Sequence, residues 1–170
     1  MSSTGKRLRY ITPQGFRRLS DEHGRIWSEL RPRIVAEVEA AAALGDRSEN
    51  AEHIYGKRKL RELDRRLRFL STLMDDLTVV DPRPHPSGKA YFGAWVTVEG
   101  EDGEERVYHL VGPDETDAAA GAISVEAPLG RALLGKAEGD VARVDRPSGA
   151  AEVTVLQVAW GPPGRPPGRR

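Results

Sequence analysis

Apolar residues recur every three or four positions through the first quarter of the chain. The stripe consists of Phe16, Leu19, His23, Ile26, Leu30, Ile34, Val38, Ala41 and Leu44. This period is that of one face of an α-helix. Thr12 is a suitable N-cap and Pro13 suits the first helical position, so the helix is expected to begin there. Pro32 lies inside this helix and should kink it, because proline removes a backbone hydrogen bond.

A second stripe follows after a polar break, and its members are Leu60, Leu63, Leu67, Leu70, Met74 and Leu77. Its steps alternate between three and four residues, which is typical of a coiled-coil seam. Each helix would run for about 30 residues, or roughly 45 Å. The two stripes therefore predict an N-terminal antiparallel two-helix coiled-coil hairpin.

The second half of the chain has the alternation and the residue types of β-strands. Strands are expected over 90–98 and 106–111, joined by a turn at Glu101, Asp102 and Gly103, and over 123–125, 141–145 and 153–160. A short helix is expected over 129–134, after Pro128 and before Gly135. One helix against an antiparallel sheet is an α+β arrangement.

Proline and glycine mark the boundaries between these parts. The alternating prolines of residues 81–88 forbid helix and favour an extended linker. We therefore expect a hairpin domain over 1–80, a linker over 81–88 and a sheet domain over 89–160. The segment 161–170 is almost entirely Gly, Pro and Arg, and it is expected to be a disordered tail.

Composition narrows the possible functions. Lys plus Arg and Asp plus Glu both number 26, so a uniformly basic nucleic-acid binder is not expected and any electrostatic role requires local segregation of charge. There is no cysteine, which excludes disulfides and thiolate metal sites. The four histidines are scattered without metal-ligand spacing. No apolar stretch is long enough to span a bilayer, so a cytoplasmic protein is expected.

Two carboxylates, Asp46 and Glu49, lie in the break between the two helical stripes. They fit a structural role, in which Asp46 caps the second helix and Glu49 completes a capping box, with Gly45 closing the first helix. The alternative is a functional role, as acids presented at the end of a projecting rod. Spacing alone favours the structural role and does not establish catalysis.

The residues around this pair resemble the tip of the bacterial Gre transcript-cleavage factors. The run from Gly45 to Glu52 matches the Gre tip motif, the run from Tyr55 to Arg66 is similar to that of the GreB branch, and the run from Ala127 to Asp140 is similar to Gre C-terminal domains. The resemblance extends more thinly over 11–160. It implies a sheet domain with an FKBP-like fold.

The resemblance also implies a function. In the Gre family the hairpin enters the secondary channel of RNA polymerase, the sheet domain docks at the channel rim, and the acids at the positions of Asp46 and Glu49 help to hold the second catalytic Mg²⁺. The polymerase then cleaves the 3′ end of backtracked RNA. We expect this chain to be a monomeric cleavage cofactor, with no nuclease activity and no tightly held Mg²⁺ of its own.

Four arginines, Arg58, Arg61, Arg65 and Arg68, step by three and four residues along the second helix and share one face. A solvated face is the simpler interpretation, with the arginines paired to Glu62, Asp64 or acids of the first helix. An unpaired line of arginines would instead form an RNA-binding basic stripe, as the resemblance to GreB implies.

Three other functions stay open at this stage. They are a Gre-like regulator that inhibits the polymerase without cleavage, a peptidyl-prolyl isomerase suggested by the FKBP-like domain, and a plain coiled-coil adaptor. His53 departs from the family, which more often has Tyr at its position. Heptad counting places His53 on the seam side, so packing is the favoured role over pH sensing.

Overall fold

The computed structural model describes residues 8–44 and 50–164, and it divides the chain into two compact units. One unit comprises Met1–Leu8 and Gln14–Leu77, and the other comprises Arg9–Pro13 and Thr78–Arg170. Residues 9–13, which were expected within the hairpin domain, therefore group with the second unit. The proposed tail is described only as far as Gly164. No helix in the described ranges is long and apolar enough to cross a membrane.

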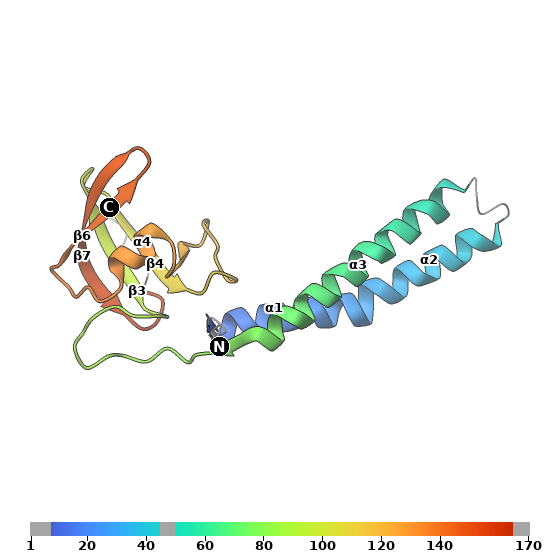
Figure 1. Ribbon diagram of the computed structural model, residues 1–170, viewed down its shortest axis with the longest axis horizontal. Helices are drawn as coiled ribbons and strands as arrows, with labels where there is room; N and C mark the ends of the chain where they lie inside the picture. Colours follow the sequence, from blue (N-terminus) through green and yellow to red (C-terminus); the bar gives the residue numbers. More distant parts are fainter. Residues whose placement is uncertain (1–7, 45–49, 165–170) are drawn as a thin grey trace, which may run out of the picture. The chain divides into compact units, whose positions relative to one another are not determined.

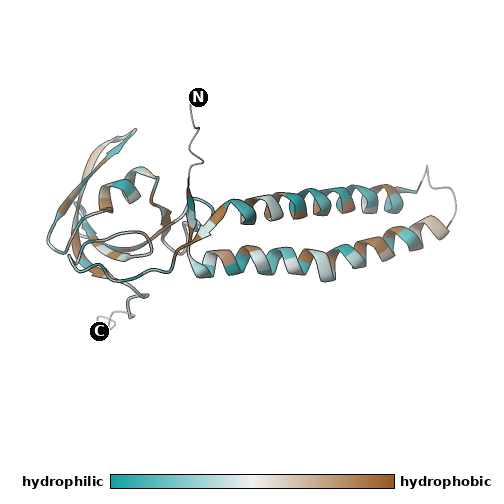
Figure 2. Cartoon of the chain, turned by 60° about the horizontal axis from the view of Figure 1, so that its bottom comes forward, coloured by the Kyte–Doolittle hydropathy of each residue, from teal (hydrophilic) through white to brown (hydrophobic). Residues whose placement is uncertain are grey.

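The first unit is a helical hairpin (Figure 1). Its outgoing arm consists of α1 (Pro13–Arg25), a π-helical turn (Ile26–Leu30) and α2 (Arg31–Ala43), and its returning arm is the single helix α3 (Ala51–Asp76). Hydrophobic residues recur along both arms between polar ones (Figure 2). The buried residues of the seam are Ile26, Leu63, Leu67 and Leu70, with Leu19, Leu30, Ile34 and Met74 packed against them. The predicted two-helix hairpin is confirmed.

The outgoing arm is interrupted next to Pro32, as the sequence predicts, and the interruption is a π-helical turn. The amide of Arg31 donates to the carbonyl oxygen of Ile26, five residues back, and Pro32 has no amide hydrogen to restore the ordinary ladder. The hydroxyl of Ser28 donates to the carbonyl oxygen of Gly24 at 2.7 Å. The interruption thus widens one turn of the helix without breaking the arm.

The seam differs from the predicted stripes at two positions. Leu44 is 79% exposed, because α2 ends at Ala43 and Leu44 is its C-cap residue. Leu73, which the predicted stripe omits, is buried at 7% exposure, whereas the stripe member Met74 is half-buried.

The second unit contains a five-stranded sheet with strand order β5-β4-β3-β7-β6. Its elements are β3 (Trp95–Gly100), β4 (Glu105–Val111), β5 (Ala122–Ser124), α4 (Pro128–Leu133), β6 (Val141–Arg146) and β7 (Gly149–Ala159). The predicted strands and the single short helix are confirmed, with β3 beginning at Trp95, later than expected. The sheet is mixed and not wholly antiparallel, because β5 pairs with β4 in parallel.

The core of the sheet domain is built from small and β-branched residues. Its buried members are Ala90, Ala94, Val96, Val98, Leu110, Leu133, Ala142, Val153 and Val155. Leu133 is the large residue that α4 contributes to this core, and it is fully buried. Burial of such a side chain stabilises the domain by about 1.5–3 kcal/mol.

Two short strands that the sequence analysis missed, β1 (Arg9–Ile11) and β2 (Leu77–Val79), pair with each other. Ile11 is fully buried, and its carbonyl oxygen accepts from the amide of Val80 at 2.9 Å. Arg9, which was expected in a loose terminus, forms two hydrogen bonds with Asp114, at 2.5 and 2.6 Å. The carboxylate of Glu115 accepts from the amide of Thr12 at 2.7 Å and from its hydroxyl. These contacts explain why residues 9–13 group with the second unit.

Candidate functional site

The two helix ends at the hairpin tip define the candidate site. The helix α2 ends at Ala43 and α3 begins at Ala51. Asp46 and Glu49 lie between these helix ends and outside the described residues. The structure describes the two helix ends that flank this segment.

Asn50 makes two hydrogen bonds that join the helix ends. As the N-cap of α3, its side-chain oxygen accepts from the amide of His53 at 3.2 Å. Its Nδ2 atom donates to the carbonyl oxygen of Ala41 in α2, at 2.8 Å. The proposed capping box of Asp46 and Glu49 is therefore wrong for α3, because Asn50 occupies the N-cap position and the third helical residue is His53.

His53 packs between the two arms, one turn below Asn50. It is 8% exposed, and its Nδ1 atom lies 3.5 Å from the carbonyl oxygen of Val38, at the outer limit of a hydrogen bond. The prediction of a packing role for His53 is confirmed.

Gly56 allows the closest approach of the arms, one further turn from the tip. A Cβ atom added at Gly56 would lie 2.6 Å from Cγ2 of Val38, a distance that real Cβ atoms do not show. Asn50, His53 and Gly56 thus lie at intervals of three residues on one face of α3 and all meet α2. We call these three residues the tip clasp. It holds the last turns of the two helices together directly behind the segment that carries Asp46 and Glu49.

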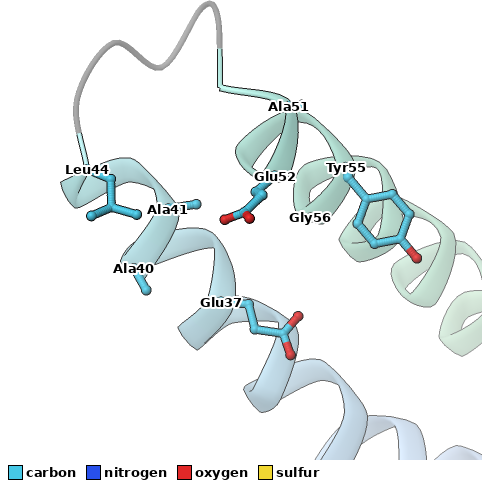
Figure 3. A pocket seen from close by; sticks show the side chains of 8 residues that line it. All are labelled: Glu37, Ala40, Ala41, Leu44, Ala51, Glu52, Tyr55 and Gly56. Atoms are coloured by element: carbon cyan, nitrogen blue, oxygen red, sulfur yellow. The ribbon is translucent and has the colours of Figure 1, made fainter.

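An open groove of about 520 Å³ lies beside the tip clasp, and Figure 3 shows its eight lining residues. Glu52 extends from the first turn of α3 across the groove towards α2 (Figure 3). The other carboxylate in the lining is Glu37, whose Oε1 atom lies 3.3 Å from Nε of Arg33. Within 8–44 and 50–164 no three His, Asp or Glu side chains come together as a metal site.

The stalk below the tip is crossed by two arginine–carboxylate pairs. Arg66 of α3 makes hydrogen bonds of 2.6 and 3.0 Å with the two carboxylate oxygens of Glu22, and Nε of Arg31 donates to Asp64 at 2.8 Å. The hydrogen bond from Arg66 lowers the pKa of Glu22, against the smaller opposing effect of burial. Such half-exposed pairs stabilise by only about 0–1 kcal/mol each, so they orient the arms more than they hold them together.

The four arginines of the proposed stripe are all exposed on α3. None of them forms an ion pair or hydrogen bond with another described residue. The acids that could have neutralised the stripe are engaged elsewhere, since Glu62 lies 3.7 Å from Lys59 and Asp64 pairs with Arg31. With respect to residues 8–44 and 50–164, the stripe is therefore a line of unpaired positive charge on α3.

Sequence reasoning missed Asn50 and Gly56 as members of the tip clasp. Both left a signal. Asn is among the best N-cap residues and Asn50 directly precedes the helical run, and an isolated glycine inside a helical pattern usually has a packing reason. The contact of Gly56 with Val38 could not be read from either signal, because it depends on how the arms pair.

Comparisons with known proteins agree with this architecture. Residues 9–79 match the family model "Transcription elongation factor, N-terminal", and residues 85–159 match "Transcription elongation factor, GreA/GreB, C-term". The chain is 49% identical over 153 residues to the transcription elongation factor GreB of Yersinia pestis, covering 90% of each protein. It is 52% identical over 149 residues to that of Haemophilus influenzae, covering 88% of this chain and 94% of the relative.

Among solved structures, the GreA factor homolog 1 (Gfh1) of Thermus thermophilus is 22% identical and superposes with a TM-score of 0.40, covering 89% of this chain and 99% of that chain. The family assignment rests on the two family-model matches and on the two GreB relatives. These matches span both units and nearly the full length of the GreB relatives. The chain therefore belongs to the GreA/GreB family of transcription elongation factors, and its sequence is similar to the members named GreB.

Proposed function

We propose that this protein inserts its hairpin into the secondary channel of RNA polymerase and stimulates the cleavage of backtracked RNA by the polymerase itself. The observation that carries the proposal is the tip clasp, in which Asn50, His53 and Gly56 bind the ends of two long helices together. A narrow helical hairpin with firmly held helix ends can place side chains in the active site of another protein. Family membership makes RNA polymerase the partner, and the sheet domain would dock at the rim of its channel.

Asp46 and Glu49 are the groups that the rod would deliver. Carboxylate oxygens are the ligands that Mg²⁺ prefers, and Mg²⁺ commonly takes only one or two of them together with water. Two carboxylates thus fit a shared ion better than an ion held by this chain alone. In phosphodiester hydrolysis such an ion stabilises charge on the attacking and leaving oxygens. The role of this chain would be to position its two acids, with no nuclease activity in the isolated protein.

The test is RNA release from backtracked transcription complexes. Asp46→Asn and Glu49→Gln keep the shape of each side chain and remove its charge, and each is expected to lower the cleavage rate by about two orders of magnitude, as for loss of one group from a preorganised site. Glu52→Gln is the matched control, because it removes a carboxylate that is close in sequence to Glu49 and lines the open groove beside the tip clasp. It should cleave at nearly the wild-type rate.

The same assay separates the competing functions. An inhibitor of the polymerase would slow elongation and release no RNA fragment. A coiled-coil adaptor would show no dependence on Asp46 or Glu49. Full cleavage by both acid variants would overturn the proposal.

We also propose that the arginine stripe holds the extruded RNA. The arginines at positions 58, 61, 65 and 68 are exposed and unpaired among the described residues, and their line of guanidinium groups carries the charge opposite to that of a phosphate backbone. By this account the tip acids act on the scissile bond while the stripe retains the RNA 3′ segment.

A further inference from the structure

Trp27 is a large aromatic residue that the hairpin leaves exposed. It lies in the π-helical turn of the outgoing arm and is 63% exposed, whereas its neighbour Ile26 is buried in the seam. A tryptophan on the surface lacks the stabilisation that burial of its large side chain would give. Its exposed position therefore requires another explanation. π-Helical turns frequently occur at functional sites.

Trp27 lines an open groove of about 460 Å³ between the two arms. The other lining residues are His23, Leu67, Arg68, Ser71 and Thr72. The floor is held by a contact of 3.0 Å between Nε2 of His23 and the hydroxyl of Ser71. We call this groove the Trp27 groove. It combines an aromatic ring, one arginine and hydroxyl groups.

The Trp27 groove continues the arginine stripe. Arg68 is both the last member of the stripe and a wall of the groove, and Thr72 follows it by one helical turn. The acid one turn before Arg68 is Asp64, and it is already paired with Arg31 at 2.8 Å. A single-stranded nucleic acid that follows the stripe from Arg58 would therefore reach Trp27 without meeting an unpaired carboxylate of α3.

The other side of the hairpin has no such character. The groove there is lined by Asp21, Glu22, Arg25, Ile26, Leu30, Lys59, Glu62, Leu63 and Arg66. Its acids and bases largely neutralise each other, as the pairs Arg66–Glu22 and Lys59–Glu62 show. The Trp27 groove has no acidic residue in its lining, so of these two grooves it is the one complementary to a polyanion.

We propose that Trp27 is a stacking platform for a nucleobase of single-stranded RNA, at the end of the arginine stripe farther from the tip. Proteins that bind single strands without sequence preference combine a basic track with aromatic rings on which bases stack. The ring of Trp27 supplies the stacking face and Arg68 the adjacent phosphate contact. This inference rests on the proposed RNA-holding role and adds to it the class of contact and its place.

The position of Trp27 predicts how much RNA must be extruded before the contact forms. Arg68 lies about 27 Å along α3 from Asn50. An RNA strand that starts at the tip would need about eight nucleotides to cover that distance if its bases are stacked, and fewer if it is extended. Trp27 should therefore matter for long backtracked segments and not for short ones.

Trp27→Leu keeps an apolar side chain and removes the ring. In complexes backtracked by about 15 nucleotides, we expect cleavage at limiting factor to require roughly 5- to 150-fold more of this variant, the range found when one base–aromatic stack is lost. In complexes backtracked by about three nucleotides it should match the wild type. Phe69→Leu is the matched control, because Phe69 is also exposed, at 54%, but lies next to Arg66, whose guanidinium is 5.2 Å from its ring.

A measurement without polymerase tests the same contact. Titration of the full chain with single-stranded oligoadenylate should quench tryptophan fluorescence, and Trp27→Leu should lose that quenching although Trp95 and Trp160 are retained. Far-UV circular dichroism checks that both variants are folded.

The outcomes distinguish this inference from the proposed function. Wild-type behaviour of Trp27→Leu on long segments overturns the inference and leaves the role of Asp46 and Glu49 standing. Equal losses on long and short segments would assign Trp27 to a protein contact with the polymerase, and a change in oligomeric state would assign it to a second copy of this chain. Either result overturns stacking on RNA. If instead Asp46→Asn cleaves normally, the proposed function fails while the fluorescence titration still decides the inference.

Discussion

Asn50 shows how one side chain can serve two helices at once. Its oxygen caps α3, and its nitrogen donates to the carbonyl oxygen of Ala41 near the end of α2, which also accepts from the amide of Leu44 at 3.3 Å. The amide of His53 is one of the first-turn donors that have no partner within the helix, whereas the carbonyl of Ala41 gains a second donor. A single amide therefore satisfies a donor on one arm and an acceptor on the other, which a purely acidic or purely hydroxyl cap does less well.

Asn50→Ala is expected to destabilise the hairpin by about 1–2 kcal/mol, since the cap and the bond between the arms are both lost. Asn50→Asp is the separating control. It keeps the oxygen that accepts from His53 and removes the donor to Ala41. Compared with Asn50→Ala, it should therefore restore the cap of α3 but not the hydrogen bond to α2. Hydrogen exchange of the α2 and α3 amides near the tip measures both effects. Equal protection in all three proteins would contradict the two-bond account of Asn50.

The residues of the tip were only partly predictable. Heptad counting places His53 on the seam side, and this prediction needs no information beyond the sequence of α3 itself. The sequence allows Asp46 as the cap of the second helix, since Asp and Asn are nearly equivalent caps and both occur in one short segment. What separates them is the carbonyl of Ala41, which enters only when the arms are paired.

At the scale of the elements, the close pairing of α2 and α3 near the tip depends on Gly56. Glycine inside a helix ordinarily costs about 1 kcal/mol relative to alanine. Here it permits an approach to Val38 that a Cβ atom would block at 2.6 Å. Val38 is β-branched and has few alternative rotamers, so it cannot easily move aside.

Gly56→Ala should therefore destabilise the hairpin by about 1–3 kcal/mol despite the better helix propensity of alanine. The control is Gly24→Ala in α1, where nothing lies within 4 Å of the added Cβ atom. That variant should stabilise the hairpin by about 0.5–1 kcal/mol. Thermal unfolding followed by circular dichroism gives both values.

Val38→Ala combined with Gly56→Ala should recover part of the loss, because contacting residues are not additive. Strict additivity of the two changes would show that the clash is not between these side chains.

Elements set by local pattern were predicted well, and elements set by distant partners were not. Both helical arms, the strands of the sheet domain and α4 carry their own period or turn residues. The strands β1 and β2 are too short to show a period, and they exist because residues far apart in sequence pair. The parallel pairing of β5 was missed for the same reason. Pro32 predicts the place of the interruption in the outgoing arm, but only the structure shows its π-helical form.

At the scale of the whole molecule, a net charge of zero conceals an uneven distribution. Acids and bases pair in the groove that contains Glu22, Lys59, Glu62 and Arg66, whereas the four arginines of the stripe have no ion-pair partner among the described residues. The balanced composition argues against nucleic-acid binding only if the charges are spread evenly over the molecule. Segregation along α3 restores the possibility locally.

Reversal of the stripe tests this distribution. Converting Arg58, Arg61, Arg65 and Arg68 to Glu should weaken cleavage of long backtracked RNA more than of short, because fewer phosphates are held. Binding of single-stranded RNA should also lose salt dependence, by about 0.7 in the logarithmic slope for each phosphate contact removed.

The pair Arg61→Glu and Arg65→Glu can be matched against Arg17→Glu and Arg18→Glu, which change the net charge equally at exposed positions of α1. Equal effects of the two pairs would show that overall charge matters and the stripe does not.

The paired strands at the base of the hairpin bear on how this protein can vary. The chain enters the hairpin through β1 and leaves it through β2, so the whole stalk is an insertion closed at its root. Removing one heptad from each arm would keep the seam in register and shorten the stalk by about 10 Å. The hairpin can therefore change in length while the paired strands β1 and β2 at its base are preserved.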